Sequence, residues 1–366
     1  MKILQIYKTY TPDTFGGIEQ VIKNIYLETT KLGASHTLLT TSKHPRTDSI
    51  DDLPIIRLKN NIEMASCPFS LNFFSQFKTI AQQFDLLHFH YPWPFADFTE
   101  VLRKTDRPAM VTFHADALKH SLLRKIYSPF QKAFLNQVHR IVPTSTPLME
   151  SSETLSQYRE KCTVIPLGID PLTYPSVSKT RLQHWRVQLG VDFVLFVGVL
   201  RHYKGLLTLL DAALQLDLPI VIAGGGPLDA ELRALILQKN LKNVHLVGRV
   251  SEEDKAALYQ LCQMVVLPSH TRAEAFGIVL LEALMHRKPL ISTALGTGTS
   301  YVNQNGKTGF VIPPADVTAL VHAIKTLQNP TLAKKMGQTG HAWFLEQFQS
   351  VMMGQRYFQL YQDLLA

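Results

Sequence analysis

The stretch Pro268–Pro289, PSHTRAEAFGIVLLEALMHRKP, decides how the rest of the chain is interpreted. It follows the apolar run 264–267, MVVL, which is typical of a buried strand, and we expect a helix to start near Phe276. Glu274 stands before that helix, and Glu282 stands inside it, eight residues later. Because the first N–H groups of a helix have no partner within it, the stretch predicts an anion site beside two carboxylates.

Two interpretations of this stretch are open. Gly277 would let the backbone approach a ligand closely, and a phosphate with hydroxyls on either side of it is the chemistry of a nucleotide-sugar. Alternatively, the two glutamates meet this spacing by chance, and a carboxylate near a helix start stabilises the helix dipole without any ligand. The remaining sequence has to decide between the two.

Length and composition indicate a folded protein of two domains. The chain has 366 residues, of which 46% are hydrophobic and 18% charged. It contains no apolar run of membrane-spanning length, and its start, MKILQIYKTY, is typical of a first strand and not of a signal peptide. The three cysteines, Cys67, Cys162 and Cys262, show neither metal-ligand nor disulfide spacing, which favours a cytoplasmic location.

The net charge of +8 favours an anionic partner, and the charge is unevenly distributed. Residues 117–149 contain no Asp or Glu. Basic residues there alternate with apolar ones: Lys119, Arg124, Lys125, Lys132 and Arg140 with Leu122, Leu123, Ile126, Tyr127, Phe130 and Phe134. A basic, aromatic-rich helical pair over 117–140 would suit an acidic membrane surface. Alternatively, the apolar residues are core and the basic ones a solvated face.

Gly16 and Gly17 repeat the pattern of a strand followed by a helix start. They follow the predicted strand 3–7 and precede a helix whose apolar residues recur at helical spacing from Ile18 to Ile25. Such a glycine pair accepts a phosphate or lets a sugar approach the backbone, although turns also use Gly-Gly frequently.

Strand and helix patterns alternate along most of the chain, which indicates mainly parallel sheets covered on both faces. The predicted strands of the first half are 36–42, 54–58, 86–90, 109–114, 140–145 and 162–168. Those of the second half are 193–198, 219–224, 243–248, 264–269, 289–294 and 309–314. We therefore expect an α/β protein of two doubly wound domains, with ligands at the carboxyl ends of the strands and in the cleft between the domains.

Loops after the predicted strands of the second half carry suitable chemistry. Arg201 and Lys204 stand just before a helix, where two cations suit a diphosphate leaving group. Gly248 and Val250 end another strand, and their backbone groups are candidates to meet a base. The turn 222–227, IAGGGP, is either a ligand contact or a plain strand-to-helix connection.

His114 closes the predicted strand 109–114, where a histidine can bond a sugar hydroxyl or stabilise a transition state. A satisfied core histidine is the alternative. His88 and His90, in HFHYPWP, fit cleft lining or packing and receive no role. The chain contains no Asp-x-Asp, so a metal-bridged diphosphate is not expected.

Several motifs, in this order, make nearly the whole chain resemble the retaining GT-B glycosyltransferases of glycosyltransferase family 4. They are Gly16-Gly17 with Ile18-Glu19, Phe113-His114, VIPLGID at 164–170, VGVLRHYKG at 197–205, GGGP at 224–227, Glu274-Ala-Phe-Gly with Glu282-Ala, and NGKTGFVIPP at 305–314. In the family, an arginine usually follows the glycine of the motif found here as VGVLRHYKG. In this chain Val199 follows Gly198, and Arg201 comes two residues later. The loop GTGTSYVN at 296–303 has Ser300 where an acid is usual, as in bacterial surface-polysaccharide mannosyltransferases.

The resemblance implies roles for individual residues. Glu274 would contact the transferred sugar, Glu282 the ribose and Lys204 the diphosphate, with His114 beside the transferred sugar. Glu274, His114 and Lys204 are the expected catalytic residues. The expected donor-binding residues are Gly16, Gly17, Arg201, Lys204, Gly248, Val250, Ala275, Phe276, Gly277, Ile278 and Glu282. No metal and no cofactor would be needed.

The resemblance also implies the domain plan and the reaction. We expect an acceptor-binding domain over 1–172, a nucleotide-sugar-binding domain over 173–342, and a last helix, 343–366, that crosses back onto the first domain. The activity would be retaining hexosyl transfer to a lipid-linked or polysaccharide acceptor. GDP-mannose is the favoured donor, and a UDP-sugar is the alternative. The product would belong to cell-surface glycan synthesis, lipopolysaccharide included. The enzyme would be cytoplasmic and peripheral on the inner face of the membrane. A non-catalytic nucleotide-sugar sensor or scaffold is the other hypothesis. Nucleic acid is disfavoured as a partner because no recognised binding motif appears.

Overall fold

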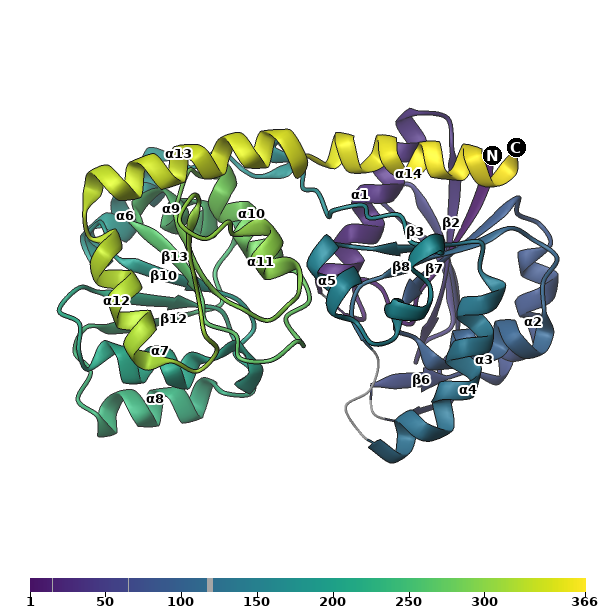
Figure 1. The fold of residues 1–366 in the computed structure, drawn as a ribbon, viewed down its shortest axis with the longest axis horizontal. Coiled ribbons are helices and arrows are strands. Elements are labelled where there is room, and N and C mark those ends of the chain that lie inside the picture. The colour runs from purple at the N-terminus through teal and green to yellow at the C-terminus, as the bar shows by residue number, and fades with distance from the viewer. Residues whose placement is uncertain (15, 65, 117–120) are drawn as a thin grey trace. The chain divides into compact units, whose positions relative to one another are not determined.

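The computed structural model describes residues 1–14, 16–64, 66–116 and 121–366, with the side chains of 121–124 left out. The chain forms two compact units, labelled with their helices and strands in Figure 1. Unit 1 contains Met1–Gly168 and Ser350–Ala366, and unit 2 contains Ile169–Gln349. The domain boundaries expected from sequence were after residues 172 and 342, whereas these units divide after Gly168 and after Gln349.

Unit 1 is built on a seven-stranded sheet in the order β3-β4-β2-β1-β7-β8-β9. All neighbouring strands are parallel except the β3–β4 pair at the edge. The strands are β1 (Lys2–Ile6), β2 (Ser35–Ser42), β3 (Arg46–Ile50), β4 (Leu53–Lys59), β7 (Leu86–Tyr91), β8 (Ala109–Phe113) and β9 (Arg140–Pro143). The helices are α1 (Gly17–Lys31), α2 (Leu71–Ala81), α3 (Pro94–Arg103), α4 (Ser121–Gln137), α5 (Thr146–Ser151) and α14 (Ser350–Leu365).

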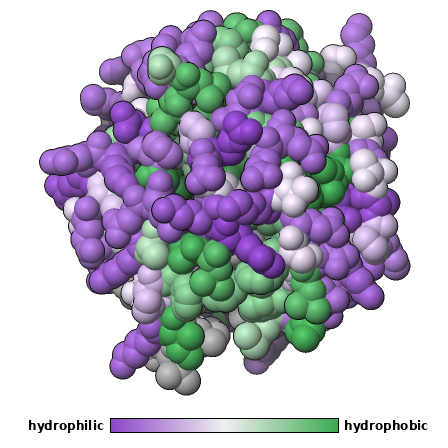
Figure 2. Space-filling model, turned by 90° about the vertical axis from the view of Figure 1, so that its right-hand side faces the viewer, coloured by the Kyte–Doolittle hydropathy of each residue, from purple (hydrophilic) through white to green (hydrophobic). Residues whose placement is uncertain are grey.

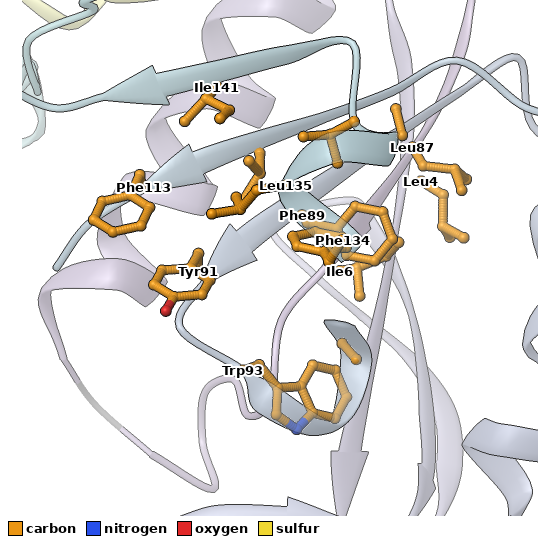
Figure 3. Close-up of a cluster of buried hydrophobic side chains, with 14 of the residues drawn as sticks. Leu4, Ile6, Leu87, Phe89, Tyr91, Trp93, Phe113, Phe134, Leu135 and Ile141 are labelled. Carbon is orange, nitrogen blue, oxygen red and sulfur yellow. The ribbon is translucent and has the colours of Figure 1, made fainter. Parts of the chain in front are cut away.

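Alternation along the central strands gives the sheet of unit 1 two different faces. Leu87, Phe89 and Tyr91 of β7 point into an apolar core shared with α3 and α4, together with Trp93 and Phe134 (Figure 3). The residues between them, His88 and His90, therefore lie on the opposite face, and both are buried. Register places Gln5 beside His88 and Thr112 beside His90 on that second face. One face of the sheet is thus apolar and largely aromatic. The other, called the polar face below, carries buried polar side chains next to apolar ones such as Ile3 and Leu38.

The last helix, α14, covers the polar face of unit 1 and packs against α1. Tyr357 and Tyr361 are fully buried there, and Gly354 lies so close to α1 that a Cβ atom would overlap the Glu28 side chain. The helix expected over 343–366 is two helices in the structure. The first, α13 (Pro330–Gln347), belongs to unit 2, and the second, α14, to unit 1.

Unit 2 is built on a six-stranded parallel sheet in the order β12-β11-β10-β13-β14-β15. The strands are β10 (Val194–Val197), β11 (Ile220–Ala223), β12 (Val244–Gly248), β13 (Met264–Leu267), β14 (Leu290–Thr293) and β15 (Gly309–Ile312). The helices are α6 (Lys179–Leu189), α7 (Leu206–Ala213), α8 (Asp229–Gln238), α9 (Glu252–Leu261), α10 (Ile278–Met285), α11 (Gly298–Val302), α12 (Val317–Leu327) and α13. Each strand predicted in this half is present, a residue or two shorter at its ends.

One expectation for unit 1 is wrong, and three of its short strands were missed. The segment 162–168 is not a strand, although Thr163 and Ile165 donate to carbonyls of β9. Pro166 has no N–H with which to continue such a ladder. The small hairpin of β5 (Ile62–Met64) and β6 (Cys67–Phe69) and the antiparallel edge strand β3 were not predicted. β3 is polar, and β5 and β6 have three residues each, so none of them shows the apolar alternation on which such predictions rest.

Candidate active site

The sheet of unit 2 changes its direction of winding between β10 and β13. The chain runs outward from β10 through β11 to β12, and then places β13 on the other side of β10. Ligands of doubly wound folds bind at such a point, beyond the carboxyl ends of the strands. The loop after β10 carries Lys204 and the loop after β13 carries Glu274, so both lie at this edge.

These two loops are in direct contact. His270 donates its backbone N–H to the Tyr203 carbonyl at 2.9 Å. Gly205 has φ +71°, and a Cβ atom there would overlap the Pro268 carbonyl oxygen. A glycine is required on both counts, because other residues rarely adopt this φ and would collide with Pro268. The close approach sets the position of Lys204, the residue before Gly205.

Lys204 and Glu274 form a buried ion pair. The Lys204 Nζ donates to Oε2 of Glu274, and Ser269 Oγ donates to the same oxygen at 2.9 Å. Both charged side chains are buried, as is Ser269. The residue expected to bind the diphosphate and the residue expected to contact the sugar are therefore brought together at one point.

The backbone from Glu274 to Gly277 is supported by the following loop. Thr297 Oγ1 donates to the Glu274 carbonyl at 2.8 Å, and Gly298 donates its N–H to the Ala275 carbonyl at 2.8 Å. Gly277 caps α10 with φ +79°, so the helix begins at Ile278, two residues after Phe276 and near the predicted start. The N–H groups of the first turn thus lie a few residues after Glu274, on a backbone held by hydrogen bonds.

Glu282 lies further inside α10, and both of its carboxylate oxygens accept hydrogen bonds from side chains. Its Oε1 accepts from Lys255 Nζ at 2.9 Å and from the Tyr174 hydroxyl at 3.0 Å, and its Oε2 accepts from the Tyr259 hydroxyl at 2.8 Å. The carboxylate is buried. Burial, and then the Glu282 charge, raise the pKa of both tyrosines, so both remain hydroxyl donors at neutral pH. Sequence alone did not suggest these three partners.

The other donor-site residues expected in unit 2 differ in exposure. Phe276 and Gly277 are buried, whereas Ala275, Ile278, Gly248 and Val250 are half-buried. Arg201 is exposed and begins the short turn that ends at Lys204. Gly248 ends β12 with φ +76°, and its carbonyl accepts from Gly224 N–H at 2.8 Å.

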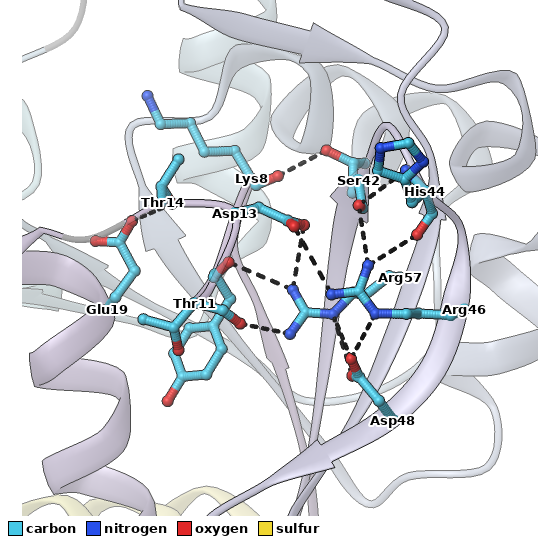
Figure 4. A network of polar contacts seen from close by, with 12 residues as sticks. Lys8, Thr11, Asp13, Thr14, Glu19, Ser42, His44, Arg46, Asp48 and Arg57 are labelled. Carbon is cyan, nitrogen blue, oxygen red and sulfur yellow. Dashed lines mark hydrogen bonds and ion pairs between the residues drawn. The ribbon is translucent and has the colours of Figure 1, made fainter.

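Gly16 and Gly17 lie at the start of α1 in unit 1, after a loop that is held by Arg57 (Figure 4). The Arg57 guanidinium is fully buried and donates to the carbonyls of Tyr10 and Thr11 at 3.3 and 2.5 Å. Its remaining N–H groups meet the carboxylates of Asp48 and Asp13. Sequence analysis did not identify Arg57, because β4 gives it the place of an ordinary strand residue.

His114 follows β8 and is buried on the polar face of unit 1. Its Nε2 lies 3.1 Å from Nδ1 of His90, and the two rings are stacked. Burial lowers the pKa of His114 to about 3, so its imidazole is neutral at neutral pH. His88 and His90, which received no role, line the same face, and their i, i+2 spacing in HFHYPWP was the available signal.

Most of the apolar side chains that the structure describes in the basic stretch 117–140 belong to the core. Tyr127 and Phe134 of α4 are buried, and Phe130 packs edge-to-face on Phe98. The stretch forms one described helix followed by β9, not a helical pair, while residues 117–120, with Lys119, lie outside the described residues. Ile126 is 62% exposed, and Lys125 and Lys132 of the same helix are also exposed.

An apolar surface nevertheless extends across neighbouring elements of unit 1. Figure 2 shows apolar side chains gathered on the lower half of the face that carries α2, α3 and α4. Exposed large hydrophobic residues on β5, α2, α3 and α4 include Ile62, Met64, Leu71, Leu102 and Ile126. Across the described part of the chain, none of the helices is both long and apolar enough to cross a membrane.

Among the residues that the structure describes, no group of three or more His, Cys, Asp or Glu side chains is arranged to hold a metal ion. The expectation that the reaction needs no metal stays a prediction, which an assay with chelator can test.

Two doubly wound α/β units, the second with Lys204 and Glu274 paired where its sheet reverses its winding, are the features of a GT-B glycosyltransferase. The chain matches the family described as Glycosyltransferase Family 4 over residues 15–171 and that described as Glycosyl transferases group 1 over residues 180–343. It is 44% identical to the D-rhamnosyltransferase WbpZ of Pseudomonas aeruginosa over 351 residues, which cover 95% of this chain and 92% of that protein. It is 43% identical to the O-antigen chain mannosyltransferase C of Escherichia coli, covering 100% of this chain and 99% of that protein.

Solved structures agree on the fold. Sucrose-phosphate synthase from Thermosynechococcus elongatus superposes with a TM-score of 0.79 at 21% identity, covering 99% of this chain and 98% of that one. HepE of Anabaena, solved with UDP and glucose, also gives 0.79, at 18% identity and 99% coverage of both chains. The protein therefore belongs to glycosyltransferase family 4 and has the GT-B fold.

Proposed function

We propose that this protein is a retaining hexosyltransferase that transfers mannose, or the related D-rhamnose, from a GDP-linked donor to a growing surface polysaccharide. The near-full-length similarity to a D-rhamnosyltransferase and to an O-antigen mannosyltransferase supports the sugar and the acceptor class. The observation that carries the catalytic role is the buried Lys204–Glu274 pair at the winding reversal of unit 2. A UDP-sugar is the alternative donor.

Lys204 has to change partner when the donor binds. Its ammonium now neutralises Glu274, and a bound diphosphate offers it more negative charge. In the reaction, the bond between the anomeric carbon and the diphosphate oxygen breaks and its electron pair leaves with the diphosphate. Lys204, with the exposed Arg201 at the start of the same turn, stabilises that growing charge. Glu274 then holds hydroxyls of the sugar while positive charge develops at the anomeric carbon.

Retention follows if the acceptor attacks from the face that the diphosphate leaves. The acceptor oxygen bonds to the anomeric carbon, and its proton passes to the departing diphosphate. This scheme requires neither a protein nucleophile nor a metal. Glu282 would bind the ribose, as the family resemblance implies, and would take no part in the chemical step. Its bonds to Lys255, Tyr174 and Tyr259 would hold the carboxylate in place for that contact.

The acceptor side of the proposal concerns unit 1. A lipid-linked or polysaccharide acceptor would be met at the cytoplasmic face of the membrane. The exposed residues Ile126, Lys125 and Lys132 of α4, with the apolar surface on β5, α2 and α3, suit an acidic lipid surface.

One assay separates this enzyme from a nucleotide-sugar sensor. The full-length protein is offered GDP-mannose, GDP-D-rhamnose and UDP-glucose, with and without membrane extract as acceptor source. We expect release of GDP, an α-linked product from an α-linked donor, and unchanged rates with chelator. Tight donor binding without turnover would favour the sensor, and an inverted product would contradict retention.

A further inference from the structure

The polar face of unit 1 contains a continuous chain of hydrogen bonds that ends at His114. It begins inside α1, where Thr29 Oγ1 donates to the Ile25 carbonyl at 2.6 Å. A carbonyl oxygen has no hydrogen to give, so the proton in this short contact belongs to Thr29. The Thr29 oxygen must then accept from its second neighbour, His36 Nε2, at 2.7 Å.

The direction of every later bond follows from this first one. With its proton on Nε2, a neutral His36 has an unprotonated Nδ1, which accepts from the Gln5 amide nitrogen at 3.2 Å. The amide oxygen of Gln5 therefore faces His90, and His90 Nε2 donates to it at 2.5 Å. The opposite orientation of the Gln5 amide would leave His36 Nε2 and Thr29 without a hydrogen between them.

The last bond of the chain determines which ring nitrogen of His114 carries the proton. Since the proton of His90 is on Nε2, its Nδ1 is an acceptor, and His114 Nε2 donates to it at 3.1 Å. A neutral His114 then has an unprotonated Nδ1. Burial lowers the pKa of His36 to about 3 and that of His90 well below its usual range, so all members of the chain are neutral at neutral pH.

We infer that Gln5 and His90 are positioning residues that hold His114 as the Nε2–H tautomer, so that its Nδ1 accepts a hydrogen bond from a hydroxyl of the substrate. An unprotonated nitrogen attracts a hydroxyl donor and repels a phosphate oxygen. The inference rests on the proposed role of His114 beside the transferred sugar. It adds that the sugar hydroxyl is the donor and that two residues from other strands determine this.

The ring arrangement supports a positioning role. His88 and His90 stack with their centroids 4.4 Å apart, and His90 and His114 stack at 5.4 Å. His88 is in turn held by hydrogen bonds at both nitrogens, from Nδ1 to the Tyr361 hydroxyl at 2.8 Å and from Nε2 to Thr112 Oγ1 at 2.7 Å. The stacked rings of His88, His90 and His114 are thus fixed by hydrogen bonds from His88 to β8 and to the last helix, α14.

The tautomer can be measured directly in the full-length protein labelled with ¹⁵N-histidine. His114 is assigned by comparison with His114→Gln, and long-range proton–nitrogen correlations show which ring nitrogen carries the proton. We expect a protonated Nε2 and an unprotonated Nδ1 throughout pH 6–8, with or without donor. A protonated Nδ1 in the wild-type protein would overturn the inference, whatever its activity.

Two variants of His90 separate positioning from packing. In His90→Asn the amide oxygen takes the place of Nδ1 and still accepts from His114, so tautomer and kcat/KM should stay within about 3-fold of the wild type. In His90→Gln, and in Gln5→Leu, the constraint is lost, and kcat/KM should fall about 10-fold, the value of one hydrogen bond.

Phe73→Leu is the matched control, because it loosens the apolar core on the opposite face of the same sheet without touching the chain of bonds. It should lower Tm and leave the His114 tautomer and kcat/KM unchanged. If His90→Gln and Gln5→Leu retain both the tautomer and kcat/KM, the positioning role is wrong. If His114→Gln itself retains full transfer, the proposed role of His114 fails, while the tautomer measurement still decides the inference.

Discussion

Glu282 and Lys255 form an ion pair of 2.9 Å between α10 and α9, with the carboxylate buried and the ammonium largely so. Two tyrosine hydroxyls complete the carboxylate's bonds. A residue expected to bind the ribose is therefore also part of the packing of unit 2, and its replacement should affect stability as well as affinity.

For Glu282→Ala we expect weaker donor binding together with a loss of about 3 kcal/mol in the free energy of unfolding, because Lys255 loses its buried partner and retains the exposed Glu252. Turnover at saturating donor should change little, since the ribose contact is equal in ground and transition states. Calorimetric titration with GDP and urea unfolding measure the two effects. Glu252→Gln, which removes the exposed partner of the same lysine, should leave both nearly unchanged. Normal affinity in Glu282→Ala would contradict the ribose assignment.

The buried carboxyl of Asp97 predicts how the stability of the fold depends on pH. Burial raises the pKa of this carboxyl to about 8, partly offset by the hydrogen bond from Tyr127. Because the folded protein keeps this proton to higher pH than the unfolded chain does, the contribution to stability is complete below about pH 4 and is lost progressively up to about pH 8.

Asp97→Asn removes this titration. Relative to the wild type, the variant should gain about 1.4 kcal/mol in unfolding free energy for each pH unit between pH 5 and 7.5. The neighbouring Glu100, whose pKa burial raises to about 7, and the buried histidines titrate equally in both proteins and cancel in the difference. Urea unfolding at the two pH values is the measurement. A difference that does not vary with pH would show that Asp97 is already ionised in the folded protein.

The exposed charges of α4 test the membrane proposal. Lys125→Glu with Lys132→Glu should weaken binding to vesicles containing acidic lipid by about 1 kcal/mol per basic residue removed, and added salt should weaken wild-type binding. Vesicle sedimentation measures the bound fraction. Lys334→Glu with Lys335→Glu makes the same charge change on exposed positions of unit 2 and should have little effect. Equal loss in both double variants would indicate a response to net charge and not a docking surface on α4.

Sequence patterns predicted the parts of the fold that depend on apolar alternation and on loops after strands. The strands of unit 2 and the positions of Lys204 and Glu274 after β10 and β13 followed from them. The contact between these two residues did not, because it depends on the Gly205 turn lying against Pro268. Similarly, Tyr174 and Lys255 reach Glu282 from segments whose approach only the tertiary structure determines.

In unit 1 the limits of prediction were different. The apolar residues Tyr127 and Phe134 alternate with basic ones along α4, but a pattern does not distinguish a face on the core from a face on a membrane. Gln5 appears as an isolated polar residue in an apolar strand, and His90 shares its strand with another histidine, His88. Only the parallel register of β1, β7 and β8 places Gln5 beside His90 and His90 beside His114.

The measurement that tests the central claim most directly is the turnover of Glu274→Gln with GDP-mannose or the donor identified in the panel, alongside donor affinity. The amide keeps the size of the side chain but loses the negative charge that stabilises the positive charge developing on the sugar. We expect kcat to fall by about 10²–10³-fold with donor Kd changed by less than about 5-fold, as for loss of a contact made mainly in the transition state. Glu231→Gln, an exposed glutamate of α8, should behave as the wild type. Wild-type turnover in Glu274→Gln would contradict the role given to the 268–289 stretch.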